Sequence, residues 1–307
     1  MRVFVSDPLN REAIALLAAA GVEVLEQEDA SGEQLGVALR GSDALIVRGR
    51  TQVNEDVLSR AAGLRAVCRA GSGVDNIDLE AARTRGIAVF NTPGANAVSV
   101  AELTWAMILA HHRRLVPAAV STAAGRWEKS AFTGRELEGR VLGVIGLGQI
   151  GRRVAGFGAA FGCRVLGYDP MAPAPPGAEA SALDVLLRTS DIVTLHVPLD
   201  AGTRRLLDAA RLASMKRGAV LVNCARGGVV DEEALYELIV SGHLGGAALD
   251  VFDDEPPHDR KLIELDRVLA TPHIGAATED AQRRAGVRAA EIVRDFLLQG
   301  EAAGRVV

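Results

Sequence analysis

The sequence has 307 residues, of which 49% are hydrophobic and 24% charged, and its formal net charge is −5. This apolar content is typical of a folded globular protein, not of a disordered one. The length allows two domains, because single hydrophobic cores stop growing beyond roughly 250–300 residues. The acidic balance and the lack of a long Lys/Arg run favour a protein with no nucleic-acid partner.

Cys68, Cys163 and Cys224 form no CxxC pair, so neither a disulfide framework nor a metal site is predicted. No apolar run approaches the roughly 18 residues that span a bilayer. The sequence begins with a predicted strand and not with a charged and then apolar leader. We therefore expect a cytoplasmic protein that has no membrane partner.

The first third of the chain alternates short apolar runs with helical patterns. Strands separated by helices predict βαβ units and a parallel sheet, which binds ligands at the carboxyl ends of its strands. Ser31, Asn54 and Asp78 are the expected N-caps of three of these helices. The expected strands are 2–6, 22–25, 44–47, 66–68 and 87–90, and the expected helices are 10–20, 31–39, 54–62 and 78–85.

Pro93 and Gly94 interrupt this alternation, and a long helix is expected over 98–114. The helix is apolar on most faces, so either a core or a subunit interface must bury it. Residues 125–139 are interpreted as an irregular, charged connection.

Residues 141–151 read VLGVIGLGQIG, which predicts a strand, a glycine turn and a helix that continues to about Phe161. In such a turn the first glycine permits the tight bend, the second lets the backbone approach a pyrophosphate, and the third lets the helix lie close to its strand. The helix N-terminus offers N–H donors to the phosphates. The expected cofactor-binding residues of this turn are Gly146, Gly148, Gln149, Ile150 and Gly151.

The next predicted strand, 164–168, is followed by Asp169, 18 residues after Gly151. A carboxylate at this position suits the ribose hydroxyls of NAD and would repel the 2′-phosphate of NADP. A glycine turn can also be purely structural, but here the strand, the helix and the acid all agree. We therefore predict NAD as the cofactor.

Further strands are expected at 191–197, 219–223, 246–251 and 268–270, and residues 171–176 are expected to form a surface loop. Together with 141–145 and 164–168 these make six strands, the number of a full doubly wound dinucleotide fold. The last predicted helix, 279–299, has no strand after it and can return to the first domain.

Arg226, Glu255 and His273 follow three successive predicted strands, so they should meet at one edge of the sheet. This set suits hydride transfer at a 2-hydroxy or 2-keto acid. The Arg would bind the substrate carboxylate, the His would exchange the hydroxyl proton, and the Glu would orient the His. Taken singly, each has a plainer interpretation: a solvated turn arginine, a surface acid and a capping histidine.

The motifs GLGQIG, NCARGGVVDE, ALDVFDDEPP and TPHIGA, in this order, resemble the D-isomer-specific 2-hydroxyacid dehydrogenase family. The resemblance implies that Arg226, Glu255 and His273 form the catalytic set. It also implies a Rossmann NAD-binding domain (94–280) inserted into a flavodoxin-like substrate domain (1–93), to which the C-terminal helix (281–307) returns. The further NAD contacts that it implies are Val197, Cys224, Ala225, Asp250, Gly275 and Ala276.

Within that family, residues 69–78, 91–96 and 99–103 are similar to the phosphoglycerate dehydrogenases. This implies oxidation of 3-phospho-D-glycerate to 3-phosphohydroxypyruvate, the first step of serine synthesis, by a homo-oligomer that is at least a dimer. Arg48 and Arg69 would bind the phosphate. Lys129 stands where the family places an arginine that reaches in from the partner subunit, and lysine lacks the planar fork. The other implied substrate-binding residues are Gly71, Ser72, Gly73 and Asn96.

Three alternatives stay open at this point. Arg48 and Arg69 can be ordinary solvated arginines. The substrate can be glyoxylate or hydroxypyruvate, which needs no phosphate pocket. The chain can also be a non-enzymatic NADH-sensing regulator of the same fold, although no segment indicates a partner-binding surface.

Overall fold

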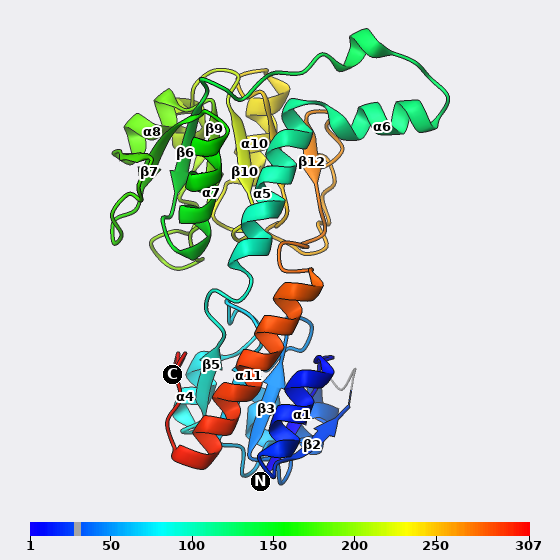
Figure 1. Ribbon diagram of the computed structural model, residues 1–307, viewed down its shortest axis with the longest axis vertical. Coiled ribbons are helices and arrows are strands. Elements are labelled where there is room, and N and C mark those ends of the chain that lie inside the picture. The colour runs from blue at the N-terminus through cyan, green and yellow to red at the C-terminus, as the bar shows by residue number, and fades with distance from the viewer. Residues whose placement is uncertain (28–31) are drawn as a thin grey trace. The chain divides into compact units, whose positions relative to one another are not determined.

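The computed structural model describes residues 1–27 and 32–307, so the predicted N-cap Ser31 lies outside the described residues. The chain forms two compact units, one of residues 1–96 and 276–307 and the other of residues 97–275 (Figure 1). Each unit is built on a parallel sheet, and the second is inserted into the sequence of the first. The predicted fold class is confirmed.

The first unit contains a five-stranded parallel sheet in the order β2-β1-β3-β4-β5. Its central strand β3 is buried along its whole length, which agrees with an apolar run and no alternation. The strands are β1 (Arg2–Val5), β2 (Glu23–Glu26), β3 (Ala44–Val47), β4 (Ala66–Arg69) and β5 (Ala88–Asn91).

Four short helices connect these strands: α1 (Arg11–Ala19), α2 (Gly32–Ala38), α3 (Glu55–Arg60) and α4 (Leu79–Thr84). Two predicted N-caps are present. The Asn54 side chain accepts a hydrogen bond from the Val57 N–H at 3.1 Å, and the Asp78 side chain accepts one from the Ala81 N–H at 2.9 Å. Each cap satisfies one backbone donor that has no partner within the helix.

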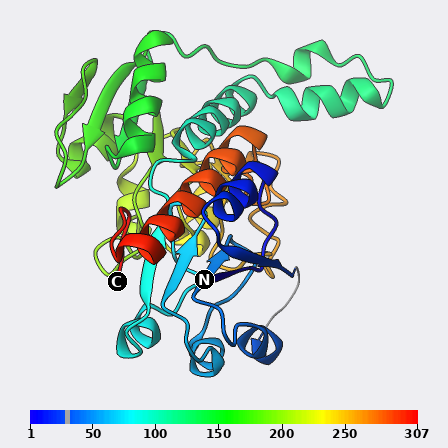
Figure 2. The same ribbon diagram turned by 60° about the horizontal axis from the view of Figure 1, so that its bottom comes forward.

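The last helix, α11 (Glu279–Gln299), packs beside α1 in the first unit, as Figures 1 and 2 both show. Its inner face is rich in alanine and glycine, which lets the two helices approach closely. A Cβ atom on Gly286 would lie 2.4 Å from Asn10 Oδ1, so the Asn10 side chain lies where a larger residue would place its Cβ. Arg283 adds an ion pair with Glu12 at 2.7 Å.

The second unit contains a seven-stranded parallel sheet in the order β12-β11-β10-β9-β6-β7-β8. The prediction of six strands was wrong by one, because β8 was missed. Its sequence is Ala-Glu-Ala and it is largely exposed at the sheet edge, so it carries no apolar run. The strands are β6 (Val141–Ile145), β7 (Arg164–Tyr168), β8 (Ala178–Ala180), β9 (Ile192–Leu195), β10 (Val220–Asn223), β11 (Gly246–Leu249) and β12 (Val268–Ala270).

The long helix α5 (Ala97–His112) is buried in the core of this unit, which decides between the two burial modes predicted for it. The Trp105 indole N–H donates to the Val154 carbonyl at 3.1 Å, and its ring stacks on Phe161 with centroids 4.7 Å apart. The other helices are α6 (Leu115–Ala123), the 3-10 helix η1 (Lys129–Phe132), α7 (Gln149–Ala160), α8 (Leu183–Thr189), α9 (Ala209–Ser214) and α10 (Glu232–Val240).

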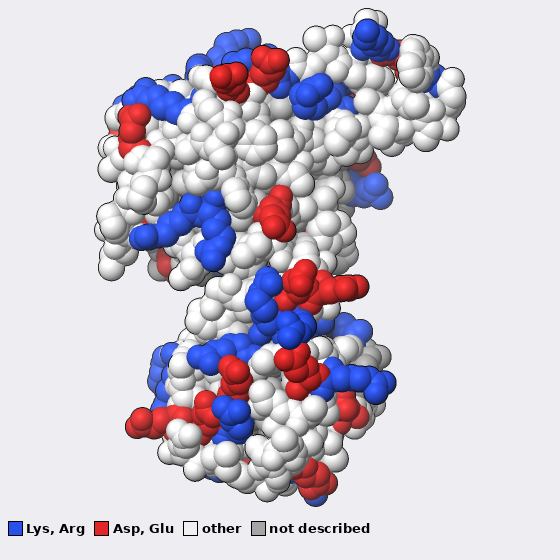
Figure 3. All heavy atoms as spheres, viewed as in Figure 1, with Lys and Arg blue, Asp and Glu red and all other residues white. Residues whose placement is uncertain are grey.

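Acidic and basic side chains are interspersed on the face of the molecule that Figure 3 shows. Among the described residues, no helix combines the length and the apolar character that crossing a membrane requires.

Candidate active site

The carboxyl ends of the strands in the second unit carry the predicted cofactor-binding and catalytic residues of that unit, whereas Lys129 lies in η1. The glycine turn follows β6, and Asp169 follows β7. Arg226, Glu255 and His273 lie in the segments after β10, β11 and β12, which are neighbours in the sheet. The chain order reverses where β6 pairs with β9, which is the point where open α/β sheets bind their ligands.

The glycine turn has the shape that a dinucleotide pyrophosphate requires. Gly146 has φ 90°, and a Cβ atom there would lie 2.5 Å from the His196 carbonyl oxygen. A Cβ atom on Gly151 would lie 1.8 Å from the Gly146 oxygen, whereas one on Gly148 would meet nothing within 4 Å. Helix α7 begins after Gly148 without a side-chain cap, so its N-terminus has room for the backbone to hold phosphates.

The Asp169 carboxylate links the glycine turn to the end of β7. Its Oδ2 accepts the Leu147 N–H at 2.7 Å, and its Oδ1 accepts the N–H groups of Met171 and Ala172 at 2.8 and 3.0 Å. Partial burial by itself would raise the pKa of Asp169, but these three bonds and the charge of Arg152 together lower it. The ionised group keeps acceptor capacity for ribose hydroxyls. The turn and the acid therefore fit NAD.

His273 and Glu255 form a hydrogen-bonded pair, with His273 Nδ1 2.7 Å from Glu255 Oε2. Glu255 Oε1 also accepts the Phe252 N–H at 3.2 Å. Partial burial would raise the pKa of Glu255, but the hydrogen bond to His273, the charge of His273, the Phe252 bond and the charge of Arg226 outweigh it and lower the pKa. Because Nδ1 is engaged, Nε2 is the ring nitrogen left to exchange a proton with a substrate.

The buried carboxylate of Asp250 fixes the segment that carries His273. It accepts the hydroxyl of Thr271 at 2.6 Å and the N–H groups of Ile274 and Gly275, both at 2.8 Å. His273 itself has φ 51°, a left-handed conformation that persists only where its surroundings impose it. Asp250 supplies that constraint on both sides of the histidine.

Arg226 lies in the turn after β10, and its charge acts on Glu255. The Asn223 side chain holds this turn, because its amide donates to the Arg226 carbonyl at 2.9 Å and its oxygen accepts the Ala225 N–H at 3.0 Å. The Arg226 Nη1 donates to the Ala225 carbonyl at 2.7 Å. The structure thus brings the three predicted catalytic side chains to one edge of one sheet.

The sequence of residues 105–275 matches the family model described as D-isomer specific 2-hydroxyacid dehydrogenase, NAD binding domain. This match covers more than half of the chain. The chain belongs to this family. The predicted resemblance is confirmed, and the inserted unit contains the NAD-binding domain of this family.

Two relatives of this chain differ in the substrates that their names give. It is 45% identical to the D-3-phosphoglycerate dehydrogenase of Methanocaldococcus jannaschii over its whole length, but it spans only 59% of that protein. It is 46% identical to the hydroxypyruvate reductase of Thermotoga maritima, and that alignment covers 94% of this chain and 96% of the relative. The crystal structure of a protein from Thermus thermophilus aligns over 100% of both chains with a TM-score of 0.92 and 39% identity.

The predicted substrate residues of the first unit lie at the carboxyl edge of its own sheet. Arg48 directly follows β3 and Arg69 ends β4. Ser72 Oγ donates to Asn96 Oδ1 at 2.7 Å, so two of these residues are in contact. The Arg69 guanidinium also has a local structural role, because its Nη1 donates to the Gly73 carbonyl at 2.5 Å.

Sequence reasoning gave no role to Glu232 or Asp253, which organise the segment of Glu255. The N–H of Asp253 donates to Glu232 Oε1 at 2.8 Å, and the Asp253 carboxylate accepts the Gly228 N–H at 2.5 Å. Glu232 lies in the quoted NCARGGVVDE motif, but an acid in the first turn of a helix is usually explained by the helix dipole. The contact with residue 253 depends on tertiary structure.

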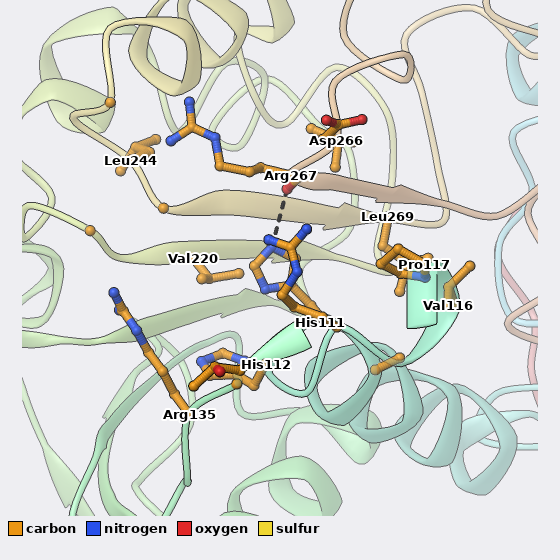
Figure 4. Close-up of a pocket in the computed structure, with 18 residues that line it drawn as sticks. His111, His112, Val116, Pro117, Arg135, Val220, Leu244, Asp266, Arg267 and Leu269 are labelled. Atoms are coloured by element: carbon orange, nitrogen blue, oxygen red, sulfur yellow. Dashed lines mark hydrogen bonds between the residues drawn. The ribbon is translucent and has the colours of Figure 1, made fainter. Parts of the chain in front are cut away.

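A pocket of about 460 Å³ lies at the opposite edge of the same sheet (Figure 4). It is lined by the amino ends of β10, β11 and β12 and by the C-terminal end of α5, where the His111 Nε2–H donates to the Arg267 carbonyl at 3.1 Å. It contains none of the predicted site residues. This pocket therefore does not coincide with the candidate active site.

Proposed function

We propose that this protein is an NAD-dependent dehydrogenase of D-2-hydroxy acids in which Arg226, Glu255 and His273 carry out the chemistry. The observation that carries the proposal is the 2.7 Å pair of His273 and Glu255, placed at the same sheet edge as a glycine turn that fits NAD. Arg226 supplies the cationic fork that can bind the substrate carboxylate by two parallel hydrogen bonds.

In the oxidation direction, His273 Nε2 accepts the proton of the substrate hydroxyl as general base. Glu255 holds the Nδ1–H and stabilises the imidazolium that forms, while Arg226 keeps the carboxylate in place. NAD, when bound, would supply the acceptor for the hydride from C2 of the substrate. In the reverse direction His273 returns the proton to the carbonyl oxygen.

The proposed NAD-holding residues are those of the glycine turn and of the strand ends beside it. The N–H groups at the start of α7 would bind the pyrophosphate and Asp169 the adenine ribose hydroxyls. The remaining proposed contacts are Val197, Cys224, Ala225, Asp250, Gly275 and Ala276.

We further propose 3-phospho-D-glycerate as the substrate, with its phosphate bound by Arg48 and Arg69. Support comes from the 45% identity with a D-3-phosphoglycerate dehydrogenase and from the position of both arginines at adjacent strand ends. Gly71, Ser72, Gly73 and Asn96 lie in segments that follow β4 and β5 at the same edge, and they complete the proposed substrate-binding set. Reduction of hydroxypyruvate is the second candidate, favoured by the relative that the chain matches over nearly its full length.

Steady-state rates with NAD and a panel of D-2-hydroxy acids, phosphorylated and not, test both candidates. Hydrogen bonds to a charged group contribute roughly 1.5–3 kcal/mol, so Arg69→Ala should lower kcat/KM for 3-phosphoglycerate about 10- to 100-fold. Rates with a small unphosphorylated acid should hardly change. An equal loss with both substrates would show that Arg69 acts by stabilising the local structure, through its bond to Gly73. It would then favour hydroxypyruvate as the substrate. If none of the acids is turned over, the alternative of a non-enzymatic, NADH-sensing regulator is favoured.

We also propose that the protein is a homodimer or a larger homo-oligomer in which α6 contacts a second copy. Helix α6 has no charged residue and projects from the rest of its unit (Figure 1), and its surface in Figure 3 is largely uncharged. Leu115 and Val120 are about 60% exposed and the nearby Trp127 is 86% exposed, which is unusual for a monomer. Lys129, on the same projection, would then reach the partner's substrate. Sedimentation of the unmodified protein and of Val120→Asp tests this, and a monomeric unmodified protein would contradict it.

A further inference from the structure

The segment that carries Glu255, residues 252–255, is held in place by bonds other than the one to His273. Within the segment, the Phe252 N–H donates to Glu255 Oε1 and the next N–H, of Asp253, donates to Glu232 Oε1. Two carboxylates thus fix two successive backbone donors. One of these carboxylates, Glu255, presents its other oxygen to His273.

Glu232 is available for this contact because another residue caps its helix. Asp231 is the N-cap of α10, and its Oδ1 accepts the Ala234 N–H at 3.1 Å. Glu232, the first residue of the helix, can therefore reach across to the neighbouring segment. β10 and β11 are paired, so the chain after β10 and the chain after β11 leave the sheet side by side.

The backbone of the Arg226 turn also packs directly against this segment. A Cβ atom on Gly227 would lie 1.9 Å from the Phe252 oxygen, so no other residue fits there. The Asp253 carboxylate accepts the Gly228 N–H on the other side of the same contact. Arg226, Glu232 and Glu255 therefore belong to one connected arrangement.

We propose that Glu232 is a positioning residue, which holds the Asp253 N–H so that Glu255 stays within hydrogen-bond distance of His273. This inference rests on the proposed function, because it gives Glu232 its effect through the proposed catalytic pair. The proposal extends the site by Glu232, a residue that acts through Glu255 and not through contact with substrate or cofactor.

The charges around Glu232 add a pH dependence to this role. Burial, followed by the nearby carboxylates, raises the pKa of Glu232 to about 7, although its bond from the Asp253 N–H opposes the rise. An ionised carboxylate is the stronger acceptor, so the contact with Asp253 should strengthen as pH rises through the neutral range. The charged groups that act on Glu232 are Asp253, Asp254 and Glu255, and its neighbours along the chain are Asp231 (paired with Arg205) and Glu233 (paired with Lys261).

Three variants separate positioning from general structural support. Glu232→Ala removes the acceptor, Glu232→Gln keeps an acceptor oxygen and removes the charge, and Glu233→Gln removes the charge of the next residue on the same helix as a matched control. The readouts are kcat as a function of pH, the Kd of NADH, and the imidazole 15N NMR signals of His273, assigned with His273→Asn.

Glu232→Ala should lower kcat about tenfold, the effect of losing one charge-assisted hydrogen bond, and leave the Kd of NADH within about twofold. Its His273 signals should move toward those of Glu255→Gln. Glu232→Gln should recover most of kcat at pH 6 and lack the inflection near pH 7, a result that holds even if Glu232→Ala does not fold. Glu233→Gln should match the unmodified protein.

The proposal is overturned if Glu232→Ala behaves like Glu233→Gln, or if its kcat falls only in proportion to the folded fraction while the His273 signals stay in place. An inflection near pH 7 that persists in Glu232→Gln would also overturn it. The NMR measurement of His273 does not require the protein to turn over a substrate. A protein that oxidises no D-2-hydroxy acid would therefore refute the proposed function, while the His273 signals would still decide the role of Glu232.

Discussion

The pairing of His273 with Glu255 predicts that the two side chains act as a unit, which a double-mutant cycle can measure. The variants are Glu255→Gln, His273→Asn and the double variant. Glu255→Gln keeps an oxygen that can accept the Nδ1–H and removes only the charge. Because the imidazolium forms during oxidation, the lost interaction belongs to the transition state and should appear in kcat.

The magnitude follows from the geometry of the pair. The 2.7 Å distance is typical of a charge-assisted bond. Such bonds contribute about 1.5–3 kcal/mol and neutral ones about 0.5–1.5 kcal/mol, so the difference is about 1–1.5 kcal/mol. The side chains are 45% and 38% exposed, and solvent screening favours the lower part of that range. Since 1.4 kcal/mol is tenfold, Glu255→Gln should lower kcat about 5- to 10-fold.

His273→Asn should lower kcat by about 10²–10⁴, the typical contribution of general acid–base catalysis. In that background Glu255→Gln should cost less than about twofold, because its effect passes through the missing imidazole. Steady-state kcat with the best substrate of the panel and the Kd of NADH, which should stay constant, form the assay. If the two losses multiply in the double variant, Glu255 acts independently of His273 and the proposed pair is refuted.

Three further predictions concern the cofactor site and stability. Asp169→Ala should weaken NAD binding and erode the preference for NAD over NADP, as measured by kcat/KM with each cofactor; equal efficiency with both in the unmodified protein would contradict the assignment. Gly151→Ala should destabilise the NAD-binding unit by about 1–3 kcal/mol in chemical unfolding, because its Cβ would lie 1.8 Å from the Gly146 oxygen; an unchanged midpoint would show that the turn relaxes. The pKa of Glu232 is raised from 4.5 to about 7, so the folded state keeps a proton that the unfolded chain loses and stability should fall as pH rises between these values. The pKa difference sets an upper limit of about 3 kcal/mol on this loss of stability, and solvent screening reduces it to about 1–2 kcal/mol. Glu232→Gln should remove the loss, and an identical pH dependence of the unfolding free energy in both proteins would contradict the prediction.

The glycine turn and the strands around it could be predicted because their signal is local. Steric limits fix where glycine is required, and a strand buried on both faces needs a continuous apolar run. The predicted ranges 44–47, 141–145, 164–168 and 268–270 match β3, β6, β7 and β12 at both ends. β8 was not predicted, because an exposed edge strand needs no apolar residues.

The sequence by itself also determined the family and led to the proposed catalytic set, because Arg226, Glu255 and His273 each follow a recognisable strand and belong to a distinctive motif. Only the tertiary structure decided how these residues are held. The Asp250 carboxylate accepts bonds from the Thr271 hydroxyl before His273 and from the N–H groups of Ile274 and Gly275 after it. These bonds, and the one from the Asp253 N–H to Glu232, join segments about 20 residues apart. A hydrogen bond to a backbone N–H requires no particular residue type at the donor, so it leaves no pattern in the sequence, and only the pairing of β10, β11 and β12 brings its two ends together.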